Sequence, residues 1–362
     1  MMMYLLLFAG LFMGWPLGTN DAANAFGTAV ATRVIQYRTA VIIIATLVIV
    51  GAYTGGANNI DKVAELATSN KVTATLAEVE SVIEEDDEDE EKKLRFRSAL
   101  KAAIIFTCAG LTVFIMSWLQ FPVSANQSIT GAIIGWGLFH ANYSDPAVLA
   151  VNLPQIGKFA STWLLNPLGA GLISFVLVWL VDRFVKNKLL SLGGYDSIIR
   201  IGYLASGAFA SYSIGLNSSA NVTALYYDAA FAQTGVAANL LTDARMAATI
   251  GGIAIALGVL TYSKKVMMTV GSNIASISQL DGFVVIIGMA LTVVIMGKWM
   301  GIPVSTSQAV VGAVIGAGLV KGVDNIHFSI LGCIALAWIS SPTVAGLMTY
   351  LVAVATQSYF LS

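Results

Sequence analysis

The stretch Trp118–Leu138, WLQFPVSANQSITGAIIGWGL, recurs later in the chain as Trp299–Leu319, WMGIPVSTSQAVVGAVIGAGL. The copies align without a gap, and one offset of 181 positions, that from Pro122 to Pro303, relates every matched residue. The matches include Trp, Pro-Val-Ser, Gln and several Gly. Agreement over so many unlike residue types is not expected by chance, so the chain contains an internal repeat.

A second, weaker pair of motifs precedes the two copies. Gly18–Asn24 reads GTNDAAN and Gly215–Asn221 reads GLNSSAN, with Gly, both Asn and one Ala at the same spacing. Each half therefore carries an Asn motif followed by a Pro-Val-Ser motif. Duplicated halves of this kind are typical of secondary transporters, whose repeats are usually inverted so that matching segments meet near the membrane midplane.

The repeat divides the chain into four regions. We expect a first repeat at 1–140, which includes a solvated, partly helical acidic loop at 57–98. Connecting spans and a loop follow at 141–200. The second repeat covers 201–320, and 321–362 forms the C-terminal span or spans.

The composition indicates an integral membrane protein. Of the 362 residues 57% are hydrophobic and 11% are charged, whereas a soluble domain carries roughly 25% charged residues. Many of the acids lie in one run, Glu84–Glu91 (EEDDEDEE), and the net charge of −1 gives no basic excess that would indicate nucleic-acid binding. We therefore predict an all-α, multi-pass protein of the cell membrane.

Apolar runs locate the membrane spans, because a helix needs roughly 20 apolar residues to cross the hydrocarbon core. Runs of that kind lie at 39–55, 100–119, 160–181, 240–262, 282–299 and 328–356. The last is long enough to be two segments broken near Ser340, Ser341 and Pro342. Shorter runs interrupted by Gly, Asn, Ser or Thr lie at 4–14, 21–32, 123–139, 201–214, 219–233 and 304–320. Irregular backbone survives at membrane depth only where protein or a water-filled cavity covers it, so these discontinuous helices predict a functional interior.

Each Pro-Val-Ser copy is predicted to form a half-helix or a re-entrant helical hairpin. Pro fits the first turn of a helix, and Ser124 and Ser305 are suitable N-caps. A helix N-terminus inside the protein carries free N–H groups and about half a positive charge, which suits an anion. Two such ends could surround a small oxyanion with donors from Asn126, Gln127, Ser128, Thr306, Ser307 and Gln308.

Asp21 is an acid within an otherwise apolar segment. An ionisable group at that depth is expensive and is normally functional; the alternative is a span-end aspartate that reaches water or caps a helix. Asn20 and Asn24 stand four positions apart, as do Asn217 and Asn221, so each pair lies on one helix face. These amides are either ion ligands or hydrogen-bonding pairs between helices.

A carboxylate beside an anion site repels the anion, by about 4 kcal/mol at a separation of roughly 4 Å and an effective dielectric of about 20. A cation bound between them reverses the sign. Apart from Lys298 at the edge of one motif, the motifs contain no Lys or Arg, which would more often ring an anion pore. The sequence therefore favours a cation-coupled transporter over a passive anion channel. Alternatively, Asp21 accepts a proton from a protonated oxyanion such as H₂PO₄⁻.

The other polar residues in apolar surroundings give weaker signals. Asp228 is either a second cation ligand or a helix-end residue, and Asp281 precedes an apolar run and suits an N-cap. His140 and His327 lie at segment ends and receive no role. No nucleophile–base arrangement, structural-metal cluster or nucleotide fingerprint is found, so we predict no enzyme activity and no cofactor besides the coupling ions.

At these motifs the sequence resembles the inorganic phosphate transporter family of sodium- or proton-coupled phosphate symporters. The family's GANDVANA-like motif is similar to Gly18–Asn24 and Gly215–Asn221, and its PVSTTH-like motif is similar to Pro122–Gln127 and Pro303–Gln308. The segment Lys264–Ile277, KKVMMTVGSNIASI, resembles the stretch ahead of the family's second hairpin.

The resemblance implies inverted repeats, a homodimer, and phosphate held at the repeat interface with cations beside it. The expected phosphate ligands are Asn24, Ser124, Gln127, Ser128, Asn221, Ser305, Thr306, Ser307 and Gln308. The expected sodium ligands are Asn20, Asp21, Asn24, Asn126, Asn217 and Asn221, of which Asp21 is the anionic one.

Three features depart from the family. Gln127 and Gln308 stand where the family has histidine, Ser218 stands where it often has Asp, and the long loop of animal members is absent. The lost histidines and Asp favour sodium over protons as the coupling ion. We therefore predict import of inorganic phosphate coupled to sodium by alternating access. Proton-coupled phosphate symport, sulfate symport and a passive anion channel are the alternatives.

Overall fold

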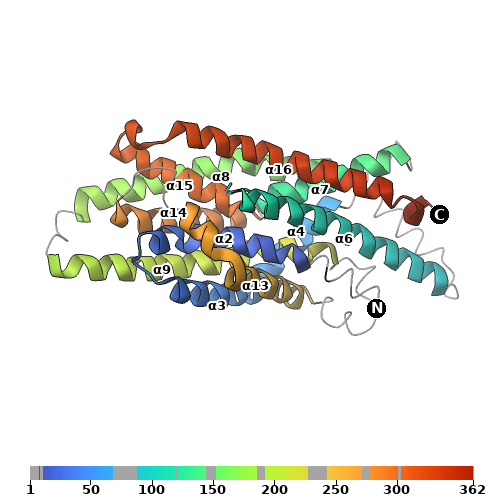
Figure 1. Cartoon of the computed structure of the whole chain (residues 1–362), viewed down its shortest axis with the longest axis horizontal. Helices are drawn as coiled ribbons and strands as arrows, with labels where there is room; N and C mark the ends of the chain where they lie inside the picture. The colour runs from blue at the N-terminus through green and yellow to red at the C-terminus, as the bar shows by residue number, and fades with distance from the viewer. Residues whose placement is uncertain are drawn as a thin grey trace.

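A computed structural model describes residue 8 and residues 11–67, 88–119, 121–143, 152–185, 192–226, 243–270, 278–300 and 303–361. All regular structure in these residues is helical, apart from one isolated bridge residue. The helices form an elongated bundle whose members run roughly along its long axis, with α16 along one edge (Figure 1). The α-helices are α2 (Gly14–Ala31), α3 (Tyr37–Gly55), α4 (Ile60–Ala64), α6 (Glu88–Trp118), α7 (Ala125–Tyr143), α8 (Leu153–Leu180), α9 (Leu192–Ser218), α10 (Ala220–Thr223), α13 (Ala244–Val270), α14 (Gln279–Met300), α15 (Thr306–Lys321), α16 (Phe328–Ala355) and α17 (Ser358–Leu361).

The six long apolar runs are confirmed as helices in the described residues. Six helical stretches there are long and apolar enough to cross a membrane: Tyr37–Ala64, Ala99–Trp118, Leu153–Phe184, Ala244–Met268, Gln279–Gly297 and Phe328–Ala355. Each overlaps one of the six long apolar runs. Helices are the expected solution because in lipid every backbone N–H and C=O must be paired within the segment.

Three expectations about individual segments are wrong. α16 is one continuous helix through Pro342, because neighbouring helices can compensate a proline inside a membrane bundle. α9 is far longer than the apolar run 201–214 that predicted it. The start of the predicted solvated loop is also packed, since Ile60, Val63 and Leu66 are buried in α4 and in the 3₁₀ turn Glu65–Ala67 that follows it. Of the acidic run, residues 84–87 lie outside the described residues, whereas residues 88–91 begin α6.

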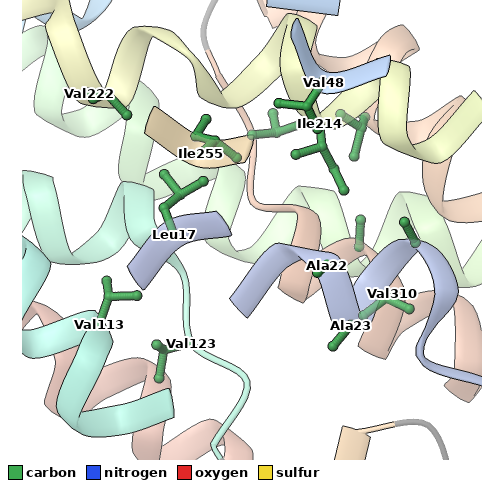
Figure 2. Packing of buried hydrophobic residues seen from close by; sticks show 14 of the residues in the cluster. Leu17, Ala22, Ala23, Val48, Val113, Val123, Ile214, Val222, Ile255 and Val310 are labelled. Carbon is green, nitrogen blue, oxygen red and sulfur yellow. The ribbon is translucent and has the colours of Figure 1, made fainter. Parts of the chain in front are cut away.

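Small residues allow the central helices to approach closely. α2 packs along α13, and α3 packs along α9. A Cβ atom added to Gly18 would lie 2.0 Å from the carbonyl oxygen of Ile255, and one added to Gly215 would lie 2.0 Å from that of Val48. The Asn motif of each half therefore begins at a glycine that touches the backbone of the other half. Figure 2 shows the aliphatic packing between these helices, with Leu17 of α2 beside Ile255 of α13.

The same doubled arrangement holds the Pro-Val-Ser helices. α7 packs along α16 and α15 packs along α8. A Cβ atom added to Gly131 would lie 2.1 Å from the carbonyl oxygen of Pro342, and one added to Gly312 would lie 2.1 Å from that of Pro167. The correspondence between the halves thus extends to α8 and α16, which the sequence comparison left outside the two repeats.

Candidate functional site

Asp21 lies in the middle of α2 and is buried, as are its neighbours Asn20 and Asn24. Oδ1 of Asp21 accepts hydrogen bonds from Thr306 Oγ1 at 2.8 Å and from Asn24 Nδ2 at 3.2 Å. Oδ2 accepts one from Ser218 Oγ at 3.4 Å. The carboxylate therefore joins α2 to the end of α9 and the start of α15. The alternative of an aspartate that reaches water at a span end does not fit this burial.

The two amides of the first Asn motif extend the cluster. Asn24 Nδ2 also lies within hydrogen-bonding distance of Thr306 Oγ1, at 3.3 Å, and of Ser307 Oγ, at 3.2 Å. Ser307 Oγ donates to Asn20 Oδ1 at 3.1 Å, and Asn20 Nδ2 donates to Ser117 Oγ at 2.8 Å. Sequence reasoning missed Ser117, because one serine in an apolar span carries no motif.

The second Asn motif is used differently. Asn217 Oδ1 accepts from the backbone N–H of Val304 at 2.9 Å, and its Nδ2 donates to the carbonyl of the same residue at 2.7 Å. Asn217 thus holds the extended segment ahead of α15 and has no hydrogen bond to Asp21. Asn221 Nδ2 donates to Asn126 Oδ1. The structure therefore brings together the expected sodium ligands of the first motif. The remaining ones lie elsewhere: Asn126 and Asn221 bond to each other at the start of α7, and Asn217 bonds to the segment ahead of α15.

The contacts cross between the two halves. Asn24 of the first half meets Ser307 of the second, and Asn221 of the second half meets Asn126 of the first. Asn126 and Ser307 occupy equivalent positions in the two Pro-Val-Ser motifs. Each Asn motif is therefore bonded to the Pro-Val-Ser motif of the opposite half.

Ser124 and Ser305 are confirmed as N-caps. Ser305 has an extended backbone, with ψ of 114°, and its Oγ accepts from the N–H of Gln308 at 3.1 Å. Ser124 Oγ accepts from the N–H of Gln127 at 3.3 Å. Capping of this kind uses one of the free donors of each first turn, and the helix ends keep their partial positive charge.

Two further side chains that the sequence analysis missed support these helix starts. Asn166 of α8 donates from Nδ2 to the carbonyl of Ser305 at 2.6 Å. Trp338 of α16 donates from Nε1 to the carbonyl of Pro122 at 3.1 Å. Asn166 could have been found as a buried amide directly before Pro167 in an apolar span, whereas Trp338 had no such signal.

The first turns of α7 and α15 each place one side chain, Gln127 and Gln308, at the wall of a cavity of about 950 Å³. This cavity is open at the surface of the bundle, where its lining residues Leu138, Leu164 and Ile339 are exposed. Gln127 and Gln308 both line it, and its other walls come from α7, α8 and α16. Ser128 lies in the same turn of α7, where its hydroxyl donates to the carbonyl of Ser124 at 3.3 Å. The cavity is mostly apolar away from the two glutamines, with Leu138 and Trp338 among its lining residues.

The electrostatics of the cluster depend on Asp21. Among the described residues, Asp21 and Asp281 are the charged residues that are buried. Lys321 pairs with Asp281 at 3.2 Å, whereas no basic side chain pairs with Asp21 in the part of the chain that the structure describes. The positive charge near Asp21 must come from helix ends or from bound cations.

The N-cap prediction for Asp281 is wrong. The N-cap of α14 is Ser278, whose Oγ accepts from the N–H of Asp281 at 3.2 Å, while Oδ2 of Asp281 accepts from the N–H of Ser278 at 3.4 Å. This reciprocal pair is a capping box, with Asp281 at the third helical position. Asp228, the other uncertain acid, lies outside the described residues.

The chain is similar to known proteins in sequence and in fold. A family model described as "Phosphate transporter family" matches residues 17–349. Proteins of Thermococcus kodakarensis and Pyrococcus abyssi, both described as "Putative phosphate permease", are 27% and 28% identical over 95% and 96% of each chain. The sulfate permease of Bacillus subtilis is 27% identical over 94% of this chain and 84% of its own. A solved structure titled "The sodium-dependent phosphate transporter" has the same fold, with a TM-score of 0.76, 23% identity and 99% of each chain covered.

Proposed function

The chain belongs to the phosphate transporter family, and we propose that it imports inorganic phosphate together with sodium by alternating access. It is a multi-pass protein of the cell membrane, and phosphate is the substrate of its family. Coupling to sodium, the identity of the ligands and the transport cycle are the proposed parts.

The cluster around Asp21 carries the proposal for sodium. Its buried oxygens belong to a carboxylate and two hydroxyls, those of Asp21, Thr306 and Ser218, and Asn24 donates to the carboxylate from Nδ2. Hard cations prefer oxygen ligands of these kinds. The single negative charge without a basic partner suits a monovalent cation, and Asn20 extends the same set through Ser307.

The phosphate site is proposed at the starts of α7 and α15. Gln127 and Gln308, in the first turns of α7 and α15, line the same cavity. Helix N-termini bind phosphate because their N–H groups and dipoles point at the ligand. A sodium ion at Asp21 would offset the repulsion between that carboxylate and the phosphate.

Alternating access is supported by the contacts that cross between the halves. Asn24–Ser307 and Asn221–Asn126 join side chains of opposite halves. Side-chain contacts of this kind can be exchanged for contacts to ions or substrate without breaking helices. We propose that the halves are inverted repeats, that α7 and α15 are re-entrant, and that the transporter is a homodimer, as the family resemblance implies.

Uptake of radioactive phosphate into proteoliposomes tests the proposal. With the membrane potential clamped, an inward sodium gradient should raise internal phosphate above the external concentration, and an equal potassium gradient should not. Equal uptake in both would exclude sodium coupling, and a proton gradient would then be applied. Equilibration without accumulation would indicate a channel.

Sulfate is the second candidate substrate, because one relative is described as a sulfate permease. Excess unlabelled sulfate distinguishes the two. Phosphate uptake that persists in a large excess of sulfate supports phosphate as the substrate. Sulfate-driven inhibition together with faster uptake of labelled sulfate would reverse the assignment.

A further inference from the structure

Gln127 and Gln308 have unused hydrogen-bonding capacity inside the protein. The side chain of Gln308 is 0% exposed, and neither its Oε1 nor its Nε2 has a partner among the described residues. Gln127 is 2% exposed, and its Oε1 has no partner either. Both residues line the same cavity.

Such groups are unusual, because nearly all buried polar atoms are hydrogen-bonded and an orphaned one costs roughly 1–3 kcal/mol. The oxygen and the nitrogen of a glutamine side chain can exchange places by a flip of the amide. For Gln308 the exchange changes nothing, because both ends lack a partner. The two glutamines therefore lack a partner that both donates and accepts hydrogen bonds.

The cluster around Asp21 does not have this need. Both of its carboxylate oxygens already accept hydrogen bonds, from Thr306, Asn24 and Ser218. Gln308 follows directly after Thr306 and Ser307, which face that cluster, yet its own side chain lines the cavity. Unused acceptors thus lie on the cavity side of α15, one residue away from the proposed sodium ligands.

The cavity also offers donors. Trp163 of α8 lines it, and the indole Nε1 of this residue is buried without a partner among the described residues. Nε2 of Gln308 is a second donor. Donors suit the oxygens of an oxyanion, whereas the amide oxygens need a hydroxyl hydrogen. Phosphate carries at least one P–OH group at neutral pH, while sulfate is fully ionised and carries none.

We infer that the amide oxygens of Gln127 and Gln308 accept a hydrogen bond from the P–OH group of the transported phosphate, and so select protonated oxyanions over fully ionised ones. This inference rests on the proposed phosphate function. Two neutral side chains would then discriminate between phosphate and sulfate, which have the same tetrahedral shape. A site built to bond a substrate hydroxyl rejects analogues that lack it far more strongly than an apolar pocket rejects an extra group.

Monofluorophosphate is the decisive probe, because it replaces P–OH by P–F and is a tetrahedral dianion at neutral pH. Its inhibition of phosphate uptake is compared with that by unlabelled phosphate. The wild-type protein should favour phosphate strongly. Gln308→Met, which keeps the size and loses donor and acceptor, should reduce this preference by about tenfold, equivalent to roughly 1.4 kcal/mol. Gln127→Met should act in the same direction.

Two further variants separate recognition from folding. Gln308→Glu keeps acceptor oxygens, so it should keep the preference for P–OH over P–F even where phosphate binds more weakly. Gln155→Met removes another buried glutamine, whose Nε2 donates to the carbonyl of Lys62 at 3.3 Å away from the cavity. This control should change stability without changing the preference.

The outcomes separate the inference from the proposed function. An unchanged ratio of phosphate to monofluorophosphate inhibition in both Met variants overturns the inference and leaves phosphate transport standing. A wild-type protein that takes up labelled sulfate and not phosphate overturns the proposed function itself. Loss of the preference in Gln155→Met would show that the effect is indirect, which also overturns the inference.

Discussion

Thr306 Oγ1 donates a hydrogen bond of 2.8 Å to Oδ1 of Asp21, and this contact joins two residues that are 285 positions apart. Thr306 is the first residue of α15 and Asp21 lies inside α2. The bond therefore connects the Asn motif of one half to the Pro-Val-Ser motif of the other. It also places a hydroxyl and a carboxylate together where the proposed sodium would bind.

Asp21→Asn should weaken the dependence on sodium more than it weakens folding. The amide keeps the size and one acceptor oxygen but removes the charge. The sodium concentration for half-maximal phosphate uptake should rise by about tenfold or more, roughly 1.4 kcal/mol, while the melting temperature in detergent changes little. Asp281→Asn, at the other buried aspartate, should show the opposite pattern, a lower melting temperature with sodium dependence retained. Equal sodium curves for Asp21→Asn and wild type would contradict the assignment.

Thr306→Val should raise the half-maximal sodium concentration while leaving the carboxylate in place. The valine is the same shape and lacks the donor, and a hydrogen bond to a charged group contributes roughly 1.5–3 kcal/mol. Thr292→Val is the matched control, because its hydroxyl donates within its own helix to the carbonyl of Gly288 at 2.7 Å. A similar sodium curve in both variants would argue against Thr306 as a ligand.

Ser305→Ala should raise the phosphate concentration for half-maximal uptake. The substitution removes the cap on the N–H of Gln308 and frees the first turn of α15, at a cost of about 1 kcal/mol. Phosphate uptake kinetics at saturating sodium measure the effect. A variant that loses thermal stability and keeps its phosphate affinity would contradict the proposed phosphate site at the start of α15.

Lys321→Met should destabilise the protein by about 3 kcal/mol, because it leaves the buried carboxylate of Asp281 without its partner. Thermal unfolding followed by tryptophan fluorescence measures the loss. Lys62→Met is the control, since Lys62 pairs with Glu65 and both side chains are more than two-fifths exposed. The double variant Lys321→Met with Asp281→Asn should recover part of the stability, and no recovery would contradict the pairing.

Gly131→Ala and Gly312→Ala should each destabilise the bundle by about 2 kcal/mol, because the new methyl group would overlap a carbonyl of the adjacent helix. Gly157→Ala and Gly332→Ala are matched controls, since no atom lies within 4 Å of a Cβ at either position. Alanine there should be neutral or slightly stabilising, as expected for a helical glycine. Equal melting temperatures for the two pairs would contradict the close packing.

The sequence predicted most of the fold because the membrane makes hydropathy decisive. The six long apolar runs became six helices, and the doubled Pro-Val-Ser motif placed both N-caps correctly. Pro342 misled the prediction, because proline is a weak signal of a break where neighbouring helices support the backbone. Ile60 and its apolar neighbours were missed since a short polar-flanked segment gives no span signal.

The site was predicted in its members and only partly in its contacts. Asp21, Asn24, Thr306 and Ser307 do meet. Asn217 was placed with them by motif similarity, and its amide instead pairs with the backbone of Val304. Asn20 and Asn217 hold the same position in the two Asn motifs. Their hydrogen-bond partners differ because the residues around them differ between the two halves. Lone polar residues such as Ser117 cannot be assigned partners before the helix pairs are known.

The pairing of Asn217 with Val304 has a mechanical consequence. The amide makes two hydrogen bonds to the N–H and the C=O of one residue, as a neighbouring β-strand would. Any displacement of the start of α15 relative to α9 must break both bonds together. It would leave the backbone N–H and C=O of Val304 without partners inside the bundle. The contacts between α15 and α2 involve side chains alone, and ions can replace them. During transport we therefore expect α15 to shift relative to α2, while α9 and α15 move together as one rigid body.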